Sequence, residues 1–253
     1  MEAPQTAVIL AAGRGKRLKE LSAHRPKPLV EINDTSILSN LVQSIIANDL
    51  KRVILVVGYK AEAIIDHLKP FEHSIGIEYV KNEAYDTTNN IYSLWLARNY
   101  LEEGFYLFEA DVYFEPKIMS ALVRQPAENV MLIDRYTDRM DGTVVACDSD
   151  SRVTEVYLKR DQGNDFDFSD KFKTVNLYRI GANFYRDFCQ RKLAEYIDQD
   201  NVSSYYEAII KEGIAEGHAF FGLQTNRNKW WEIDTREDLQ IAEKMFHQVG
   251  NNG

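Results

Sequence analysis

Cysteine is scarce in this sequence. Its 253 residues include only Cys147 and Cys189, too few and too isolated for a disulfide framework or a cysteine metal cluster. No apolar run approaches the roughly 20 residues of a membrane-spanning helix. The amino-terminal MEAPQTAVIL also lacks the basic segment that opens a signal peptide. We therefore expect a cytoplasmic protein without membrane insertion.

Positive charge is also in deficit, with 30 Lys and Arg against 39 Asp and Glu, a net charge of −9. A protein whose main partner is nucleic acid needs a broad basic surface, so this balance argues against such a partner. Basic residues nevertheless gather in one short stretch: Arg14, Lys16, Arg17, Lys19, Arg25 and Lys27. A local patch of this kind is sufficient for one small anionic ligand.

Strand-like and helix-like segments alternate along the first half. TAVIL, RVILVVG and FYLFEAD are buried strand patterns, and SILSNLVQSIIAND and KAEAIIDHL have helical spacing. This alternation predicts an α/β fold with a Rossmann-like, doubly wound mixed sheet whose strands are mostly parallel. In the second half, GTVVACDSDSRVTEVYLK indicates two strands around a polar turn. We predict a single domain over residues 1–253 with a β-rich insertion at about 135–225.

A glycine-rich loop follows the first predicted strand, in VILAAGRGKRL, residues 8–18. In open α/β sheets the ligand crevice lies at this end of a strand. Gly13 and Gly15 allow backbone N–H groups to approach a phosphate closely. The pattern is neither a dinucleotide fingerprint, because Leu18 replaces the third glycine, nor a P-loop, because no G-K-[ST] follows. A tight surface turn with solvated charges is the alternative.

Lys27 lies between Pro26 and Pro28 in RPKPLVEI. Each proline fixes its own φ and restricts the residue before it, so this lysine can point in few directions. That suits a charge directed at one oxygen atom. We expect Lys27 on a surface loop, and an ordinary proline-rich turn is the alternative.

The motif L-A-A-G-x-G-x-R-L followed by R-P-K-P-L resembles the signature of nucleotidyltransferases, which join a nucleoside triphosphate to a phosphorylated small molecule. The resemblance implies a nucleotide-diphospho-sugar transferase fold and a loop that wraps the triphosphate. It assigns Arg17 to the leaving β- and γ-phosphates and Lys27 to the α-phosphate, as catalytic residues. It assigns nucleotide binding to the loop and the strand end before it: Leu10, Ala11, Ala12, Gly13 and Gly15.

The same resemblance implies that Asp111, in EADVYFEP, and Asp234, in WWEIDTRED, bind Mg²⁺. A triphosphate needs a hard cation, which prefers carboxylate and phosphate oxygens. Asp111 could instead accept hydrogen bonds from backbone at a strand end, and Asp234 could cap the last helix. Glu109 and Glu232 are the neighbours most easily confused with these ligands.

The segment YDTTNNIYSLWLA, residues 85–97, resembles cytidylyltransferases that activate phosphocholine and relatives that act on 2-aminoethylphosphonate. KTVNLYRI and MDGTVV fit the same group, and the resemblance extends from Val8 to about Ala242. It implies CTP as the nucleotide. Because an amide both donates and accepts hydrogen bonds, we predict base or ribose contacts for Asn89, Asn90 and Ser93. Plain helix capping by the asparagines is the alternative.

The implied reaction transfers CMP from CTP to a small amino-alcohol phosphate or phosphonate and releases pyrophosphate. The attacking oxygen is already anionic, so positioning and charge neutralisation suffice without a strong base. Lys173 is our candidate for binding the acceptor's phosphate or phosphonate. A sugar 1-phosphate acceptor, or a non-catalytic nucleotide-binding protein, is the alternative.

The acceptor's other end is predicted to be cationic. Rings could form a cage around an ammonium group, from Tyr136, Tyr157, Tyr178, Trp230 and Trp231. Carboxylates could instead pair with a primary amine, from Asp134, Asp141 and Glu155. From both sets we select Glu155, Tyr178 and Trp230 as acceptor-binding residues. The choice between 2-aminoethylphosphonate and phosphocholine, and the oligomeric state, stay open.

Overall fold

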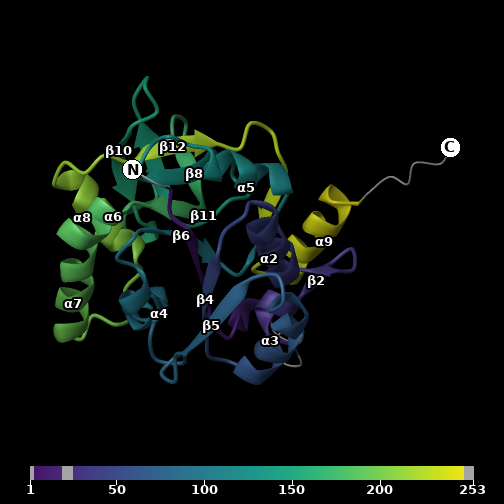
Figure 1. Cartoon of the computed structure of the whole chain (residues 1–253). Coiled ribbons are helices and arrows are strands. Elements are labelled where there is room, and N and C mark those ends of the chain that lie inside the picture. The colour runs from purple at the N-terminus through teal and green to yellow at the C-terminus, as the bar shows by residue number, and fades with distance from the viewer. Residues whose placement is uncertain (1–2, 19–24, 248–253) are drawn as a thin grey trace.

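A nine-stranded mixed sheet forms the centre of the computed structural model, which describes residues 3–18 and 25–247. Four parallel strands occupy one half of this sheet (Figure 1). In spatial order they are β5 (Gly76–Lys81), β4 (Arg52–Val57), β1 (Thr6–Ala11) and β6 (Phe105–Glu109). β1 is buried along its whole length, as its continuous apolar sequence predicts for a parallel strand covered on both faces.

The other half of the sheet is mostly antiparallel. β11 (Phe172–Ile180) pairs with β6, β8 (Val130–Arg135) and β9 (Val144–Cys147), all in antiparallel orientation. The predicted pair of strands around a polar turn is confirmed as β9 and β10 (Val153–Tyr157). β12 (Phe221–Gln224) completes the sheet in parallel orientation beside β8. The predicted doubly wound mixed sheet is therefore confirmed.

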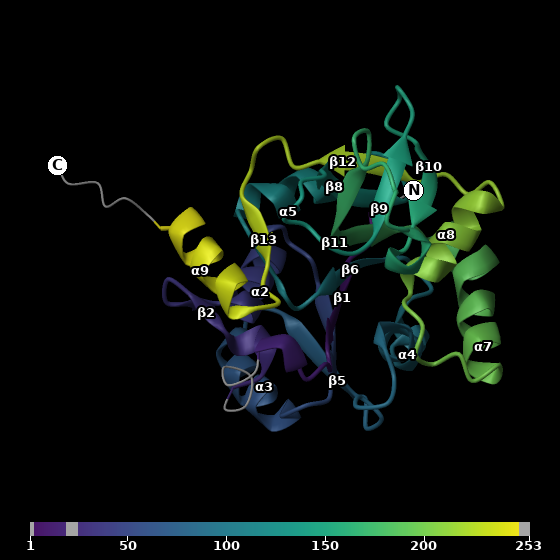
Figure 2. The same cartoon turned by 180° about the vertical axis from the view of Figure 1, so that it is seen from behind.

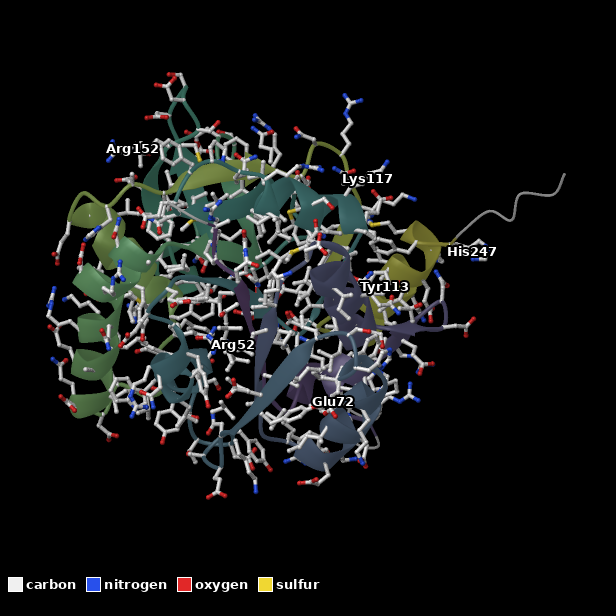
Figure 3. The ribbon with its side chains drawn as sticks, in the orientation of Figure 1. Arg52, Glu72, Tyr113, Lys117, Arg152 and His247 are labelled. Carbon is white, nitrogen blue, oxygen red and sulfur yellow. The ribbon has the colours of Figure 1, made fainter. Side chains whose placement is uncertain are left out.

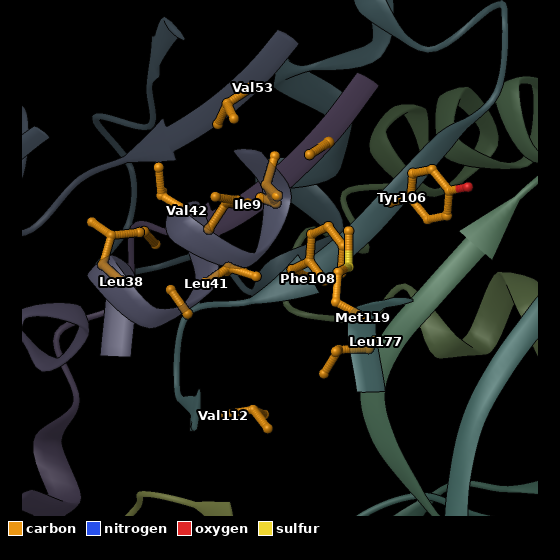
Figure 4. Packing of buried hydrophobic residues seen from close by; sticks show 14 of the residues in the cluster. Ile9, Leu38, Leu41, Val42, Val53, Tyr106, Phe108, Val112, Met119 and Leu177 are labelled. Carbon is orange, nitrogen blue, oxygen red and sulfur yellow. The ribbon is translucent and has the colours of Figure 1, made fainter. Parts of the chain in front are cut away.

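Helices cover both faces of the sheet, as Figures 1 and 2 show. One face carries α2 (Ile37–Ala47), α3 (Ala61–Leu68) and α5 (Pro116–Val123). The opposite face carries α4 (Asn90–Leu96), α6 (Ala182–Phe184), the π-helical turn η6 (Tyr185–Cys189), α7 (Gln190–Asp198) and α8 (Glu207–Ala215). A hydrophobic cluster lies on each face of the sheet, and alternate β1 residues pack into one or the other. Ile9 belongs to the first cluster, beneath α2, α3 and α5, and Val8 belongs to the second. Figure 4 shows Ile9, Leu41 and Phe108 within the first cluster.

A small additional layer forms where the chain returns at its end. β7 (Val112–Phe114) pairs with β13 (Trp230–Glu232), and β13 leads into α9 (Arg236–Met245). The hairpin β2 (Glu31–Ile32) and β3 (Thr35–Ser36) lies beside them. In Figure 3, Tyr113 lies close to α9, and its ring packs edge-on against Phe246 at 4.8 Å. This layer holds the end of β13 next to the turn after β6.

Short 3₁₀ turns complete the described chain: η1 (Lys16–Leu18), η2 (Lys27–Leu29), η3 (Lys69–Phe71), η4 (Arg98–Tyr100) and η5 (Lys159–Asp161). Among the described residues, no helix combines the length and apolar character needed to cross a membrane.

Candidate active site

The glycine-rich loop begins where β1 ends, at Ala11. Gly15 has a φ of +65°, and a Cβ at this residue would lie 3.0 Å from the Cβ of Lys27. A larger residue here would therefore be strained and would press on the lysine. Gly13 differs, since a Cβ there meets nothing within 4 Å. Lys19, part of the predicted basic patch, lies outside the described residues.

Lys27 opens the short helix η2 and is buried, with 9% of its surface exposed. Its Nζ donates to Asp111 Oδ2 at 2.8 Å and to Asp234 Oδ1 at 2.7 Å. The expectation of a surface loop was wrong, because the prolines turn this lysine inward onto two carboxylates. Burial alone would lower the pKa of Lys27, but these two carboxylates outweigh burial and raise the pKa.

Three carboxylates meet beside Lys27. One oxygen from each of Asp111, Glu232 and Asp234 lies within 4.8 Å of the others. The pairing of Val112 with Glu232 and a bond from Ile233 N–H to Asp111 O, 2.9 Å long, bring them together. Glu232, an uncertain neighbour in the sequence, thus belongs to the cluster.

Asp234 does not cap the last helix, which was the alternative to metal binding in the sequence analysis. Thr235 is the N-cap of α9, and its side chain accepts from the Asp238 N–H group. The Asp234 carboxylate instead accepts from Lys27 and from Arg17 Nη2 at 2.8 Å. The capping function is thus already filled, and the Asp234 side chain is directed at the cation cluster.

The cluster fits a divalent cation. Asp111 Oδ1 is buried and has no hydrogen-bond partner among the described residues. A buried carboxylate oxygen without a partner is costly, and a hard cation satisfies it. Asp111, Glu232 and Asp234 together offer the oxygen donors that Mg²⁺ prefers.

One cavity of about 430 Å³ lies over the glycine-rich loop, and we call it the glycine-loop cavity. Its lining includes every predicted nucleotide-binding residue, together with Arg17 and Lys27. Asn82 also lines it but was missed by sequence reasoning. It directly follows β5, and a polar residue at the carboxyl end of a parallel strand was the available signal. Asn82 Nδ2 donates to Ser93 Oγ at 3.1 Å.

A second cavity of about 520 Å³ adjoins the first, and we call it the carboxylate cavity. The two cavities share five of their lining residues: Arg17, Glu109, Asp111, Tyr205 and Asp234. A third space of about 160 Å³, the tryptophan pocket, is lined by Met140, Trp230 and Trp231 among others. The second and third spaces share another five residues: Arg17, Asp141, Lys173, Glu232 and Asp234. Asp234 therefore lines all three spaces, and Asp111 and Glu232 each line two of them.

Lys173 lines both the carboxylate cavity and the tryptophan pocket, although only 1% of its surface is exposed. Its Nζ donates to Thr174 O at 2.6 Å and lies 3.4 Å from Glu232 Oε2. It is therefore not a solvated strand lysine. Trp230 lines the tryptophan pocket, and its Nε1 donates to Asp134 Oδ2 at 2.7 Å.

Glu155 and Tyr178 are not brought to these spaces. Within the described part of the chain, neither lines any of the three cavities. Glu155 is exposed and accepts from Tyr157, because the β9–β10 register shifts between Val153 and Glu155. Such a bulge redirects side chains. Tyr178 is fully buried against Tyr206. These placements correct the assignment of both residues to the acceptor.

Carboxyl groups near the junction hold their protons unusually well. Burial, followed by repulsion from Asp111 and other acids, raises the pKa of Glu109 well above its ordinary value. Burial also raises the pKa of Glu232 to about 7, partly offset by Lys173. A cation bound beside these carboxyls would favour their ionised form and lower both pKa values.

The chain belongs to the nucleotidyl transferase family, whose model matches residues 6–244. It is 34% identical over 244 residues to the CMP-5'-(3-aminopropyl)phosphonate synthase of Streptomyces rubellomurinus. The matched region covers 96% of this chain and 39% of that relative. It is 27% identical over 248 residues to the choline-phosphate cytidylyltransferase of Streptococcus pneumoniae, covering 95% of this chain and 97% of the relative. The chain spans little more than half the length of several other relatives.

Solved structures share the fold. The CTP:phosphocholine cytidylyltransferase of Streptococcus pneumoniae superposes with a TM-score of 0.80 at 20% identity, covering 96% of this chain and 99% of that one. A UDP-glucose pyrophosphorylase complexed with UDP-glucose gives a TM-score of 0.77 at 12% identity, covering 96% and 98%. At these identities the likeness concerns the fold alone, and it agrees with the predicted nucleotide-diphospho-sugar transferase fold.

Proposed function

We propose that this protein transfers CMP from CTP to a small phosphate or phosphonate that carries an amino group, and releases pyrophosphate. One observation carries the proposal: the glycine-loop cavity and the carboxylate cavity meet at Asp111 and Asp234, the two carboxylates that Lys27 binds. Two substrates bound on either side of this junction place their reacting atoms next to each other, which is the main requirement of phosphoryl transfer.

The nucleotide occupies the glycine-loop cavity. Backbone N–H groups around Gly13 and Gly15 accommodate the triphosphate, and Arg17 neutralises the β- and γ-phosphates. Lys27 stabilises the charge that develops on the α-phosphate, a role for which it leaves its carboxylate partners. Ser93, held by Asn82, lies on the cavity wall within reach of the nucleoside.

Mg²⁺ is the proposed cofactor, with Asp111, Glu232 and Asp234 as its candidate ligands. A bound divalent cation offsets the charge of the triphosphate and of the pyrophosphate that leaves. With such a cation held by Asp111, Glu232 and Asp234, the Lys27 ammonium would be free to contact the α-phosphate.

The acceptor occupies the carboxylate cavity and the tryptophan pocket. One of its phosphonate or phosphate oxygens attacks the α-phosphorus, and the bond from that phosphorus to the bridging oxygen of pyrophosphate breaks. Lys173 and Arg17 neutralise the acceptor's anionic end. The cationic end lies near the Trp230 and Trp231 rings or Asp141, all of which line the tryptophan pocket.

The relatives support this substrate class, since the synthase and the Streptococcus enzyme are named for a CMP-aminophosphonate and choline phosphate. A direct test measures pyrophosphate release with each nucleoside triphosphate, crossed with 2-aminoethylphosphonate, 3-aminopropylphosphonate, phosphocholine and glucose 1-phosphate. We expect turnover with CTP and an amine-bearing acceptor. Preference for another nucleotide, or for glucose 1-phosphate, contradicts the proposal.

A sugar 1-phosphate acceptor is the second candidate. The shared fold with a UDP-glucose pyrophosphorylase favours it, whereas the acid-rich carboxylate cavity suits a cation better than a neutral sugar. A non-catalytic nucleotide-binding role is disfavoured, because Arg17, Lys27, Asp111 and Asp234 all converge.

A further inference from the structure

The loop between α7 and α8, residues 199–206, borders both the glycine-loop cavity and the carboxylate cavity, and we call it the dividing loop. Its residues Ser203 and Ser204 line the carboxylate cavity, and Tyr205 lines both cavities. Among the described residues, Tyr205 is the only large hydrophobic side chain that is exposed, at 56%. A ring that projects from a loop into two cavities is placed to contact bound ligands.

Two asparagines at the start of α4 hold this loop. The Asn89 N–H group donates to Val202 O at 2.9 Å, and Asn89 Nδ2 donates to Ser203 O at 3.3 Å. The Tyr206 N–H group donates to Asn90 Oδ1 at 2.9 Å. The pair predicted to read the nucleotide base therefore binds the backbone at both ends of the segment 202–206.

The side-chain amide of Asn90 is also engaged on its donor side. Asn90 Nδ2 donates to Glu109 Oε1 at 3.1 Å and to Glu207 Oε2 at 3.4 Å. Tyr206 OH donates to the same Glu109 oxygen at 2.9 Å. An amide group has two N–H donors, and both are used here. To read a base with these donors, Asn90 has to break part-buried bonds.

We propose that Asn90, assisted by Asn89, is a positioning residue for the acceptor: it fixes the dividing loop so that Tyr205 contacts the bound acceptor. The proposal rests on the proposed function for the class of acceptor. The dividing loop, which Asn90 holds, lines the carboxylate cavity. The Asn90 amide also donates to Glu109 and Glu207, which line the same cavity. The dividing loop then links a nucleotide-side helix to the acceptor site.

The first experiment separates the two substrates. Asn90→Ala is expected to raise KM for the acceptor at least ~10-fold, because a misplaced contact weakens binding. The Kd for CTP, measured by calorimetry without acceptor, is expected to change less than ~2-fold. Asn48→Ala is the matched control, since its amide bonds locally to Ser44 O, away from both cavities. An Asn90→Ala protein with weakened CTP binding and an unchanged acceptor KM overturns the proposal.

A double-mutant cycle tests the route through Tyr205. If Asn90 acts by placing this ring, Asn90→Ala adds little to the rise in acceptor KM that Tyr205→Ala causes alone. Multiplicative effects of the two changes contradict this route. Asn89→Asp is the substitute if Asn90→Ala fails to fold. It keeps the side-chain oxygen that accepts from the Asn90 N–H group, and it loses the hydrogen bond from the side-chain amide to Ser203 O. It is expected to raise the same KM ~2–5-fold, and no change in KM counts against the proposal.

Hydrogen exchange gives a readout that needs no acceptor. In Asn90→Ala, backbone amides of residues 201–206 are expected to exchange faster than in the wild type, whereas α4 stays protected. If wild-type turnover is absent but exchange changes as stated, the proposed function fails and the positioning role stands. Unchanged exchange in Asn90→Ala overturns the positioning role itself.

Discussion

Lys27 Nζ lies 2.7 Å from Asp234 Oδ1, although 207 residues separate them in the chain. The bond joins the proline-flanked lysine near the amino terminus to the turn between β13 and α9. The same lysine bonds to Asp111, so without ligands it occupies the position where a cation is needed between two carboxylates. A divalent cation held by these carboxylates would supply that positive charge instead and would leave the lysine free to contact substrate.

Lys27→Ala should affect catalysis and stability together. We expect kcat to fall by about 10²–10³, the usual effect of losing one charge-stabilising donor. Because the side chain is buried between carboxylates, we also expect the free energy of unfolding without metal to drop by about 1–3 kcal/mol. Steady-state kinetics and denaturant unfolding measure the two effects, and added Mg²⁺ should recover part of the stability but not kcat. A fully active variant would falsify the catalytic role.

Metal dependence separates the carboxylate ligands from the helix cap. A chelator should abolish activity and Mg²⁺ should restore it, and Asp111→Asn and Asp234→Asn should each raise the Mg²⁺ concentration needed. Thr235→Ala removes the true cap of α9 and should lower stability by about 1 kcal/mol without changing that requirement. If Asp234→Asn titrates with Mg²⁺ like the wild type, Asp234 is not a ligand.

Acceptor selectivity tests the cationic end of the substrate. We expect kcat/KM for 2-aminoethylphosphonate to exceed that for its hydroxyl counterpart at least ~10-fold, about 1.4 kcal/mol of transition-state binding. Asp141→Asn, at the tryptophan pocket, should reduce this ratio. Glu155→Gln should leave it unchanged, because Glu155 is exposed and lies away from the cavities. Equal efficiency for both acceptors in the wild type contradicts a cationic acceptor.

The buried carboxyl of Glu207 should make stability depend on pH. Burial raises the pKa of Glu207 above its ordinary value of 4.5. The folded state thus holds the proton more tightly than the unfolded chain, and stability falls as pH rises from 4.5 through the folded-state pKa. Glu207→Gln removes this titration, so its stability relative to the wild type should increase between ~pH 4 and ~pH 8. Chemical denaturation at both values measures the difference, and a flat or falling difference refutes the assignment.

The sequence indicated the main elements and the centre of the site. A parallel sheet that is covered on both faces buries every residue of its strands, so each strand appears in the sequence as a continuous apolar run. The covering helices appear as apolar residues at helical spacing. The glycine-rich loop follows β1 and Asp111 follows β6, and these neighbouring parallel strands end at one edge of the main sheet, so local sequence was sufficient to group the two. Lys27 lies in η2 and Asp234 follows β13 of the small two-stranded sheet, so sheet topology did not predict their place and only the resemblance grouped them with the loop.

Side-chain direction on the strands of the second half was decided only by the tertiary structure. A bulge at Val153–Glu155 turns Glu155 to solvent, and Asn176, with a φ of +60°, lies where the pairing of β11 with β8 is interrupted, between Thr174 and Tyr178. Strand periodicity of two cannot reveal where such an irregularity falls. The partners of Asn89 and Asn90 likewise depend on a loop more than 100 residues further along the chain. The sequence by itself determined the family motifs, because these depend on local residues, whereas long-range packing decided which side chains line the cavities.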